Sequence, residues 1–180
     1  MNDILYENEA PTGFGPIAIT RMVMADIDEV ARLERRSNAL PWSHNAYATE
    51  IGNTVAHYLV ARDRDGTLVG YGGMWIIMDE AHFTNIAVDP SARRRRIGER
   101  LLLSLLEYGI DRGTERATLE VRERNVIAHN LYVKHGFKDV SVRKNYYSDN
   151  QENAVIMWLD DMATPAYREH IRRCMEIANR

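Results

Sequence analysis

The sequence is poor in cysteine and has no long hydrophobic run. Its one cysteine, Cys174, cannot form an internal disulfide, so nothing calls for an oxidising compartment. No window holds the roughly 18 consecutive apolar residues of a membrane-spanning helix. Residues 1–16 are acidic and polar and lack the basic start and apolar run of a signal peptide. Together these absences predict a cytoplasmic protein that needs no membrane partner.

Five prolines and eleven glycines in 180 residues are too few for a fibrous or low-complexity chain. The 45% hydrophobic and 27% charged residues exclude intrinsic disorder, and the length suits one domain with its own core. A net charge of −3 argues against general nucleic-acid coating, so we expect no direct nucleic-acid partner. We predict a flexible arm at 1–16, a single domain at 17–160 and a helical extension at 161–180.

Hydrophobic spacing predicts an α/β chain. Apolar runs and alternation predict strands at residues 17–22, 57–62, 68–77, 81–88, 117–122, 137–142 and 154–159. Apolar residues at helical spacing predict helices at 26–36, 44–50, 97–111, 126–135 and 164–180. An antiparallel meander in the first half, followed by alternating strands and helices, gives a mixed, mostly antiparallel central sheet flanked by helices.

Four consecutive arginines, Arg93 to Arg96, stand between a predicted strand and the long helix that follows it. By itself such a run indicates a solvated turn or a nucleic-acid patch. However, the first turn of a helix has unpaired N–H groups and the positive end of the helix dipole, so it binds phosphate. Because only one glycine, Gly98, is present, the segment is neither a Walker loop nor a dinucleotide fingerprint. We interpret it as a candidate anion site.

Glu120 stands inside an apolar strand, where a carboxylate is unusual unless it is paired or functional. Burial there would raise its pKa and make it a better base near neutral pH. Tyr132 lies on the next predicted helix, and its phenol could protonate a leaving group. Spacing alone favours structural roles instead: a salt bridge from Glu120 to Arg122 or Arg124, and a core position for Tyr132.

The stretch from Asn85 to Phe137 resembles the acetyl-CoA-binding half of the GNAT superfamily of N-acetyltransferases. The superfamily's loop has Arg or Gln, two residues, Gly, one residue, then Gly or Ala; Arg93, Arg96 and Gly98 occupy these places. Within the superfamily the chain is similar to the RimI type, the bacterial ribosomal-protein alanine N-terminal acetyltransferases. The segments that carry this likeness are Leu40-Pro41-Trp42-Ser43, Asp79-Glu80-Ala81, Asn85-Ile86-Ala87-Val88-Asp89-Pro90, Leu119-Glu120-Val121-Arg122, Asn125, Leu131-Tyr132, Gly136-Phe137, Asn145-Tyr146-Tyr147 and Ala154-Val155-Ile156-Met157.

The resemblance implies a GNAT fold, with the sheet splayed into a V between the strand ending near Val88 and the strand containing Glu120. Acetyl-CoA would lie in this V as cosubstrate. Glu120 would be the base, acting through water on the acceptor's ammonium group, and Tyr132 would be the acid for the departing CoA thiolate. The residues implied to hold acetyl-CoA are Ile86, Ala87, Val88, Arg93, Arg94, Arg95, Arg96, Ile97, Gly98, Glu99 and Asn125. No metal is implied, and the six histidines show no ligand spacing along the chain.

The candidate acceptor pocket consists of Trp42, Asp79, Glu80, Tyr146 and Tyr147. Its acidic members would attract a cationic peptide N-terminus, and the implied acceptor is the N-terminal alanine of a small-subunit ribosomal protein. Ordinary packing is the alternative for Trp42 and Tyr147. Two other functions stay open: acetylation of a small amine or a lysine side chain, because the acceptor half of a shared fold varies, and non-catalytic sensing of acetyl-CoA.

Arg96 departs from the superfamily pattern, which has its first loop glycine at this position. Glycine tolerates a positive φ and lets the backbone approach a pyrophosphate closely, and arginine does neither freely. We expect either that the loop keeps its shape with a positive φ at Arg96, or that Arg96 adds a charged contact at the edge of the cofactor. In both cases acetyl-CoA binding is weakened but retained.

Overall fold

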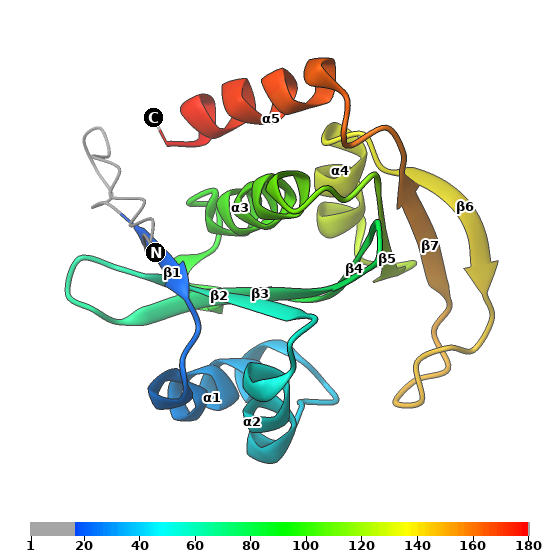
Figure 1. The fold of residues 1–180 in the computed structure, drawn as a ribbon. Helices are drawn as coiled ribbons and strands as arrows, with labels where there is room; N and C mark the ends of the chain where they lie inside the picture. Colours follow the sequence, from blue (N-terminus) through cyan, green and yellow to red (C-terminus); the bar gives the residue numbers. More distant parts are fainter. Residues whose placement is uncertain (1–16, 180) are drawn as a thin grey trace.

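Seven strands form one sheet in the computed structural model, which describes residues 17–179 (Figure 1). The predicted arm at 1–16 lies outside the described residues. The sheet order is β1-β2-β3-β4-β5-β7-β6, and every neighbouring pair is antiparallel except β4 and β5. The predicted mixed, mostly antiparallel sheet is therefore confirmed. The strands are β1 (Ala18–Arg21), β2 (Ala56–Arg62), β3 (Leu68–Ile77), β4 (Glu80–Val88), β5 (Arg116–Arg122), β6 (Lys138–Arg143) and β7 (Ala154–Leu159).

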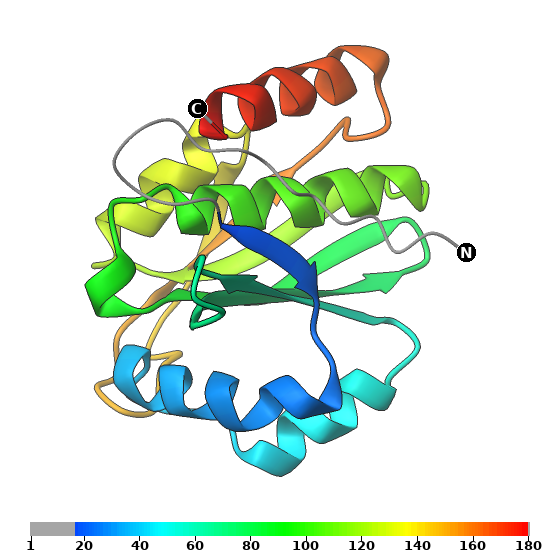
Figure 2. The same ribbon diagram turned by 90° about the vertical axis from the view of Figure 1, so that its left-hand side faces the viewer.

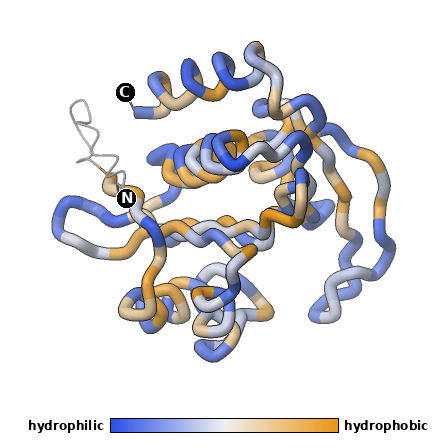
Figure 3. The backbone as a smooth tube through the Cα atoms, viewed as in Figure 1, coloured by the Kyte–Doolittle hydropathy of each residue, from blue (hydrophilic) through white to orange (hydrophobic). Residues whose placement is uncertain are grey.

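Helices cover both faces of the sheet (Figures 1 and 2). They are α1 (Ile27–Ser37), α2 (His44–Gly52), α3 (Ile97–Asp111), α4 (Val126–Lys134) and α5 (Pro165–Ala178). The first two lie on one face over a core that includes Leu33, Tyr47 and Tyr71. On the other face α3 contributes leucines to a larger core, and α5 packs on its outer side. Figure 3 shows that α5 alternates between hydrophilic and hydrophobic residues, as a helix with one buried face must.

The helix ends follow signals that are visible in the sequence. Ser43 begins α2 by accepting a hydrogen bond from the Ala46 N–H at 3.2 Å, and Asn125 begins α4 by accepting one from Ala128 at 3.2 Å. Gly113 and Gly136 follow α3 and α4 with φ of 81° and 95°, which a side chain would strain. None of the helices in residues 17–179 has the length and apolar character needed to cross a membrane.

The sheet opens between β4 and β5. These strands pair only where Glu80–His82 lies beside Arg116–Thr118, and they diverge beyond that point. Within β4, a register shift against β3 leaves Thr84 as an extra residue, which is a β-bulge. The Thr84 hydroxyl donates to the Gly73 carbonyl at 3.1 Å and lies 2.8 Å from the Tyr58 hydroxyl. The V predicted from the family resemblance is confirmed.

A buried histidine makes stability depend on pH. His57 on β2 is 7% exposed, and its ring stacks on Tyr108 of α3 with centroids 3.4 Å apart. Burial, with the nearby charges of Arg21 and Arg112, lowers the pKa of His57 to about 4. Since an unfolded histidine titrates near 6.5, between these values the unfolded chain binds a proton that the folded chain does not. Above about pH 6.5 this histidine therefore leaves the free energy of unfolding unchanged. As the pH falls from about 6.5 to 4, the free energy of unfolding decreases, by on the order of 3 kcal/mol in total.

Urea unfolding across this pH range checks the prediction. His57→Gln should give a flatter stability profile than the parent protein, because its side chain does not titrate. His44→Gln is the matched control, since His44 is exposed at the start of α2 and pairs with the exposed Asp28. An unchanged pH slope in His57→Gln would assign the acid sensitivity to other groups.

Candidate active site

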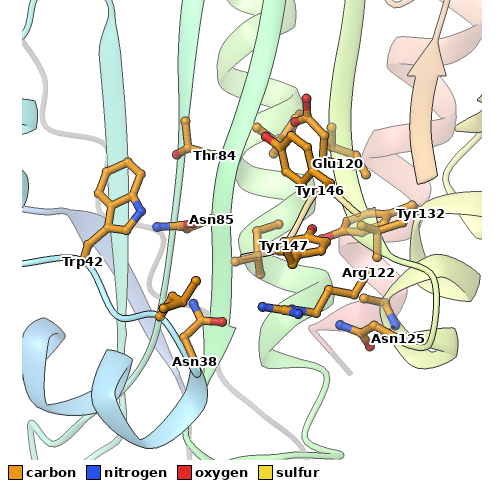
Figure 4. A pocket seen from close by; sticks show the side chains of 16 residues that line it. Asn38, Trp42, Thr84, Asn85, Glu120, Arg122, Asn125, Tyr132, Tyr146 and Tyr147 are labelled. Atoms are coloured by element: carbon orange, nitrogen blue, oxygen red, sulfur yellow. Dashed lines mark hydrogen bonds between the residues drawn. The ribbon is translucent and has the colours of Figure 1, made fainter. Parts of the chain in front are cut away.

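The opening between β4 and β5 is a cavity of about 350 Å³ (Figure 4). Five segments far apart in the sequence form its walls: the loop before α2, the middle of β4, the end of β5, α4 with its N-cap, and the loop between β6 and β7. The lining residues are Asn38, Leu40, Trp42, Phe83, Thr84, Asn85, Ile86, Leu119, Glu120, Val121, Arg122, Asn125, Ala128, Tyr132, Tyr146 and Tyr147. Seven residues predicted for the site thus meet here: Trp42, Ile86, Glu120, Asn125, Tyr132, Tyr146 and Tyr147.

Tyr132 reaches this cavity from α4, whose first turn is held by the Asn125 cap. Its ring packs on Phe137, with centroids 5.8 Å apart, and lies beside Tyr147 in Figure 4. Burial raises the pKa of Tyr132 to about 12, and the neighbouring Tyr147 adds to the shift. The phenol therefore stays protonated at neutral pH and can donate a hydrogen bond to a group that develops negative charge.

The expectation that Glu120 is buried is wrong. Its side chain is 34% exposed, and it accepts a hydrogen bond from Arg143 of β6 at 3.2 Å, not from Arg122 or Arg124. Leu119 and Val121 point into the core under α3, so strand alternation turns Glu120 to the opposite face, at the mouth of the V. Solvent thus reaches this carboxylate, which suits a base that acts through water.

Arg122 holds the loop between β6 and β7, which carries Tyr146 and Tyr147. The position of Arg122 in the sequence did not predict this role. Its guanidinium lies 3.8 Å from the centroid of the Tyr147 ring. It also pairs with Asp149 at 3.0 Å and with Glu152 at 3.3 Å, both in the loop between β6 and β7. Tyr146 packs edge-on against Tyr147, with centroids 5.1 Å apart. Arg122 therefore fixes the aromatic wall of the cavity.

The arginine run forms the loop before α3, as predicted. Arg94 and Arg96 have φ of 63° and 57°, the left-handed region that favours glycine. Arg96 thus follows the first of the two expectations: the loop keeps its shape at a non-glycine residue. Its guanidinium donates to the Ile177 carbonyl of α5 at 2.7 Å. Among residues 17–179, an added Cβ at Gly98 would meet Val88 alone, at 3.5 Å, so these residues leave room for a ligand at the start of α3.

The four guanidiniums have different surroundings. Arg95 is turned inward, and it pairs with Asp63 at 2.7 Å with 13% of its side chain exposed. Arg93 and Arg94 are exposed, and neither forms an ion pair with any residue that the structure describes. The Glu99 carboxylate faces away from the loop, because it binds His135 and Lys134. Arg93 and Arg94 are thus the side chains of this loop best placed for phosphate groups, while Ile97 and Glu99 offer only backbone N–H groups in the first turn of α3.

Asp79 and Glu80 are not brought into the pocket. Asp79 lies in the turn between β3 and β4, and Glu80 begins β4, where it meets Arg116 at 3.6 Å and His82 at 3.2 Å. A strand rises about 3.3 Å per residue, so Ile86 lies about 20 Å further along β4. The expectation that these two carboxylates attract the acceptor is therefore wrong for the cavity seen here. Glu120 supplies a carboxylate there instead.

A buried network supports the loop before α2 and was missed in the sequence. Glu34 of α1 is fully buried and accepts hydrogen bonds from the Tyr71 hydroxyl, the Asn38 side-chain amide at 2.9 Å and the backbone N–H of Trp42 at 3.4 Å. The Tyr47 hydroxyl donates to that of Tyr71 at 2.8 Å. The spacing of the residues in α1 could have predicted that Glu34 is buried. Glu34 follows Ile27 by seven positions, so the two side chains lie on the same apolar face of the helix.

This fold and this cleft define the class: an N-acyltransferase whose sheet opens into a V, with Glu120 and Tyr132 lining the opening and an arginine-rich loop before α3. The chain belongs to the acetyltransferase (GNAT) family, whose family model matches residues 27–137. It is accordingly an acyltransferase, and acetyl-CoA is its acetyl donor.

Similar proteins within this family share one kind of name. A Bacillus subtilis (strain 168) protein, provisionally named a ribosomal protein bS18-alanine N-acetyltransferase, is 43% identical over 79% of this chain and 94% of its own. The Escherichia coli (strain K12) ribosomal protein bS18-alanine N-acetyltransferase is 33% identical over 78% of this chain and 95% of its own. The crystal structure of the Escherichia coli ribosomal-protein-S18-alanine N-acetyltransferase matches with a TM-score of 0.75 and 31% identity, over 81% of this chain and 94% of that one.

Proposed function

We propose that the protein transfers the acetyl group of acetyl-CoA to the α-amine of an N-terminal alanine in a small-subunit ribosomal protein. One observation carries the proposal: Glu120, Tyr132, Trp42 and the tyrosines of the β6–β7 loop meet in one cavity. The relatives named as bS18-alanine N-acetyltransferases support the same acceptor for this chain. A ribosomal acceptor would place the protein in the cytoplasm.

In the proposed reaction the donor lies along the diverging edge of β4. Beyond His82 this edge no longer pairs with β5, so backbone groups of Ile86–Val88 can hold the pantetheine arm. Asn125 lies at the same mouth. The exposed Arg93 and Arg94, together with the first N–H groups of α3, would hold the pyrophosphate. The residues present therefore fit the donor.

The proposed chemistry is a direct transfer. An N-terminal amine has a pKa near 8, so at neutral pH most of it is ammonium and must lose a proton before it attacks. Glu120 takes that proton through water and passes it to solvent. The neutral amine then attacks the acetyl carbon, the new C–N bond forms and the C–S bond breaks. Tyr132 gives its proton to the departing thiolate, and the second proton that the nitrogen loses as the amide forms restores the phenol through solvent.

Acetyl transfer to a hexapeptide that begins Ala-Arg tests the acceptor. We expect a mass gain at the α-amine matched by an equal release of CoA thiol. The same peptide with a blocked α-amine, a lysine-containing peptide and spermidine are the comparisons. Acetylation of spermidine or lysine alone would replace the ribosomal acceptor by a small amine or a side chain. Binding of acetyl-CoA without any transfer would make the protein a sensor.

The arginine loop gives a second prediction. Arg93→Ala/Arg94→Ala should raise the KM for acetyl-CoA by on the order of 100-fold, because each charge-assisted contact to phosphate contributes at least about 1.5 kcal/mol and the variant loses two. Arg32→Ala/Arg35→Ala removes the same charge from the exposed side of α1 and should leave this KM unchanged. Steady-state kinetics at saturating peptide measures both. Equal KM values in the two double variants would remove Arg93 and Arg94 from the donor site.

A further inference from the structure

The C-terminal helix carries a group of side chains that acetyl transfer does not use. α5 follows the range matched by the family model, and it packs on the outer side of α3 (Figures 1 and 2). His170 and Cys174 stand four residues apart on this helix, so they share one face. That face meets His135, which directly follows α4.

The three side chains converge on one point. One ligand atom of each, a ring nitrogen of either histidine and the Cys174 sulfur, lies within 4.8 Å of the other two. The Cys174 sulfur is 3.6 Å from Nε2 of His170. The rings of His135 and His170 have centroids 6.2 Å apart. Four-coordinate zinc, with bonds of about 2.0–2.3 Å, holds its ligand atoms about 3.5 Å apart, so small side-chain rotations would complete the geometry.

His135 supplies independent evidence for a ligand. It is fully buried, and its Nε2 lies 3.0 Å from the Glu99 carboxylate. Its Nδ1 is also buried and has no hydrogen-bond partner among the described residues. A buried polar atom without a partner is costly, so this nitrogen calls for one. A carboxylate on one ring nitrogen and a metal on the other is a common arrangement of zinc-binding histidines.

We propose that His135, His170 and Cys174 bind a zinc ion, with water at the fourth position. Two imidazoles and a thiolate form a donor set that zinc prefers over magnesium or calcium. The ion would fasten α5 to the end of α4. It would also lie close to the donor loop, because Arg96 binds the carbonyl of Ile177, three residues after Cys174. The sequence alone did not indicate this site, because the third ligand precedes His170 by 35 positions.

Titration of the full chain with Zn²⁺ and with Co²⁺ as a spectroscopic probe tests the site, independently of acetyl transfer. We expect one Zn²⁺ per chain by calorimetry and a thiolate-to-cobalt charge-transfer absorption in the near ultraviolet. Cys174→Ser should abolish that absorption, and His170→Ala should abolish saturable zinc binding. Because neither side chain is fully buried, both variants should fold. Zn²⁺ should raise the Tm of the parent protein and not of Cys174→Ser.

Two further variants sharpen the test. Glu99→Gln should weaken zinc binding about 10–100-fold and keep the charge-transfer band, since it replaces the carboxylate behind His135, which also pairs with Lys134, and leaves the three ligands in place. His129→Ala is the matched control, because His129 pairs with Asp139 on the other side of α4 and should bind Zn²⁺ as the parent does. A parent protein that binds no Zn²⁺, or a cobalt band that survives in Cys174→Ser, would overturn the proposal.

Discussion

Tyr132→Phe is expected to lower the turnover number about 100-fold while leaving the KM for acetyl-CoA nearly unchanged. General acid catalysis contributes typically 10²–10⁴-fold, and the substitution removes only the phenolic proton. Phenylalanine keeps the ring that packs against Phe137, so folding should be preserved. Since burial raises the pKa of Tyr132 to about 12, the phenol is still protonated near pH 8 to 9, where the acceptor amine becomes neutral. The loss should therefore be the same across the range from neutral pH to about pH 9.

Tyr146→Phe is the matched control for this prediction. It removes another phenol from the same cavity, but Tyr146 is half exposed and takes part in neither proposed proton transfer. Because it lines the acceptor side, any loss should appear in the KM for the peptide, and turnover at saturating peptide should stay within about twofold of the parent. Initial rates at saturating peptide and acetyl-CoA measure both variants. Equal turnover in Tyr132→Phe and the parent would return Tyr132 to a packing role beside Phe137.

Local signals predicted the elements of this fold well. The Asn125 and Ser43 caps, the glycines after α3 and α4 and the apolar stripe of α3 are short-range features, and each lies where the sequence placed it. The divergence of β4 from β5 came from the family resemblance. Spacing along the chain does not reveal it, because it depends on how two strands pair.

The parts of the site that sequence missed depend on long-range contacts. Glu120 was expected to be buried because its neighbours are apolar, yet its partner Arg143 comes from β6 and its face of the strand is open. Asp79 and Glu80 lie where β4 begins, and the part of β4 that lines the cavity is further along the strand. Arg122 finds its acidic partners 27 and 30 residues later, in a loop whose path no local pattern fixes.

Glu34→Ala is expected to destabilise the fold by about 4 kcal/mol and to raise the KM for the peptide acceptor. The substitution leaves the buried Tyr71 hydroxyl and the Trp42 N–H without their acceptor, at about 1–3 kcal/mol each, and it opens a cavity as well. Trp42 lines the acceptor side of the pocket, so a loosened loop should affect peptide binding more than acetyl-CoA binding. Urea unfolding and steady-state kinetics measure the two effects.

Glu34→Gln keeps the volume of the side chain and removes its charge. Its carbonyl can still accept from Asn38 and the Trp42 N–H, while its amide faces Tyr71. The hydroxyls of Tyr71 and Tyr47 can then reverse their donor and acceptor roles, because each rotates freely about its C–O bond. Glutamine should therefore lose less than half the stability that alanine loses and keep the peptide KM near that of the parent. Equal losses in both variants would show that the charge of Glu34, and not its position as an acceptor, holds the loop.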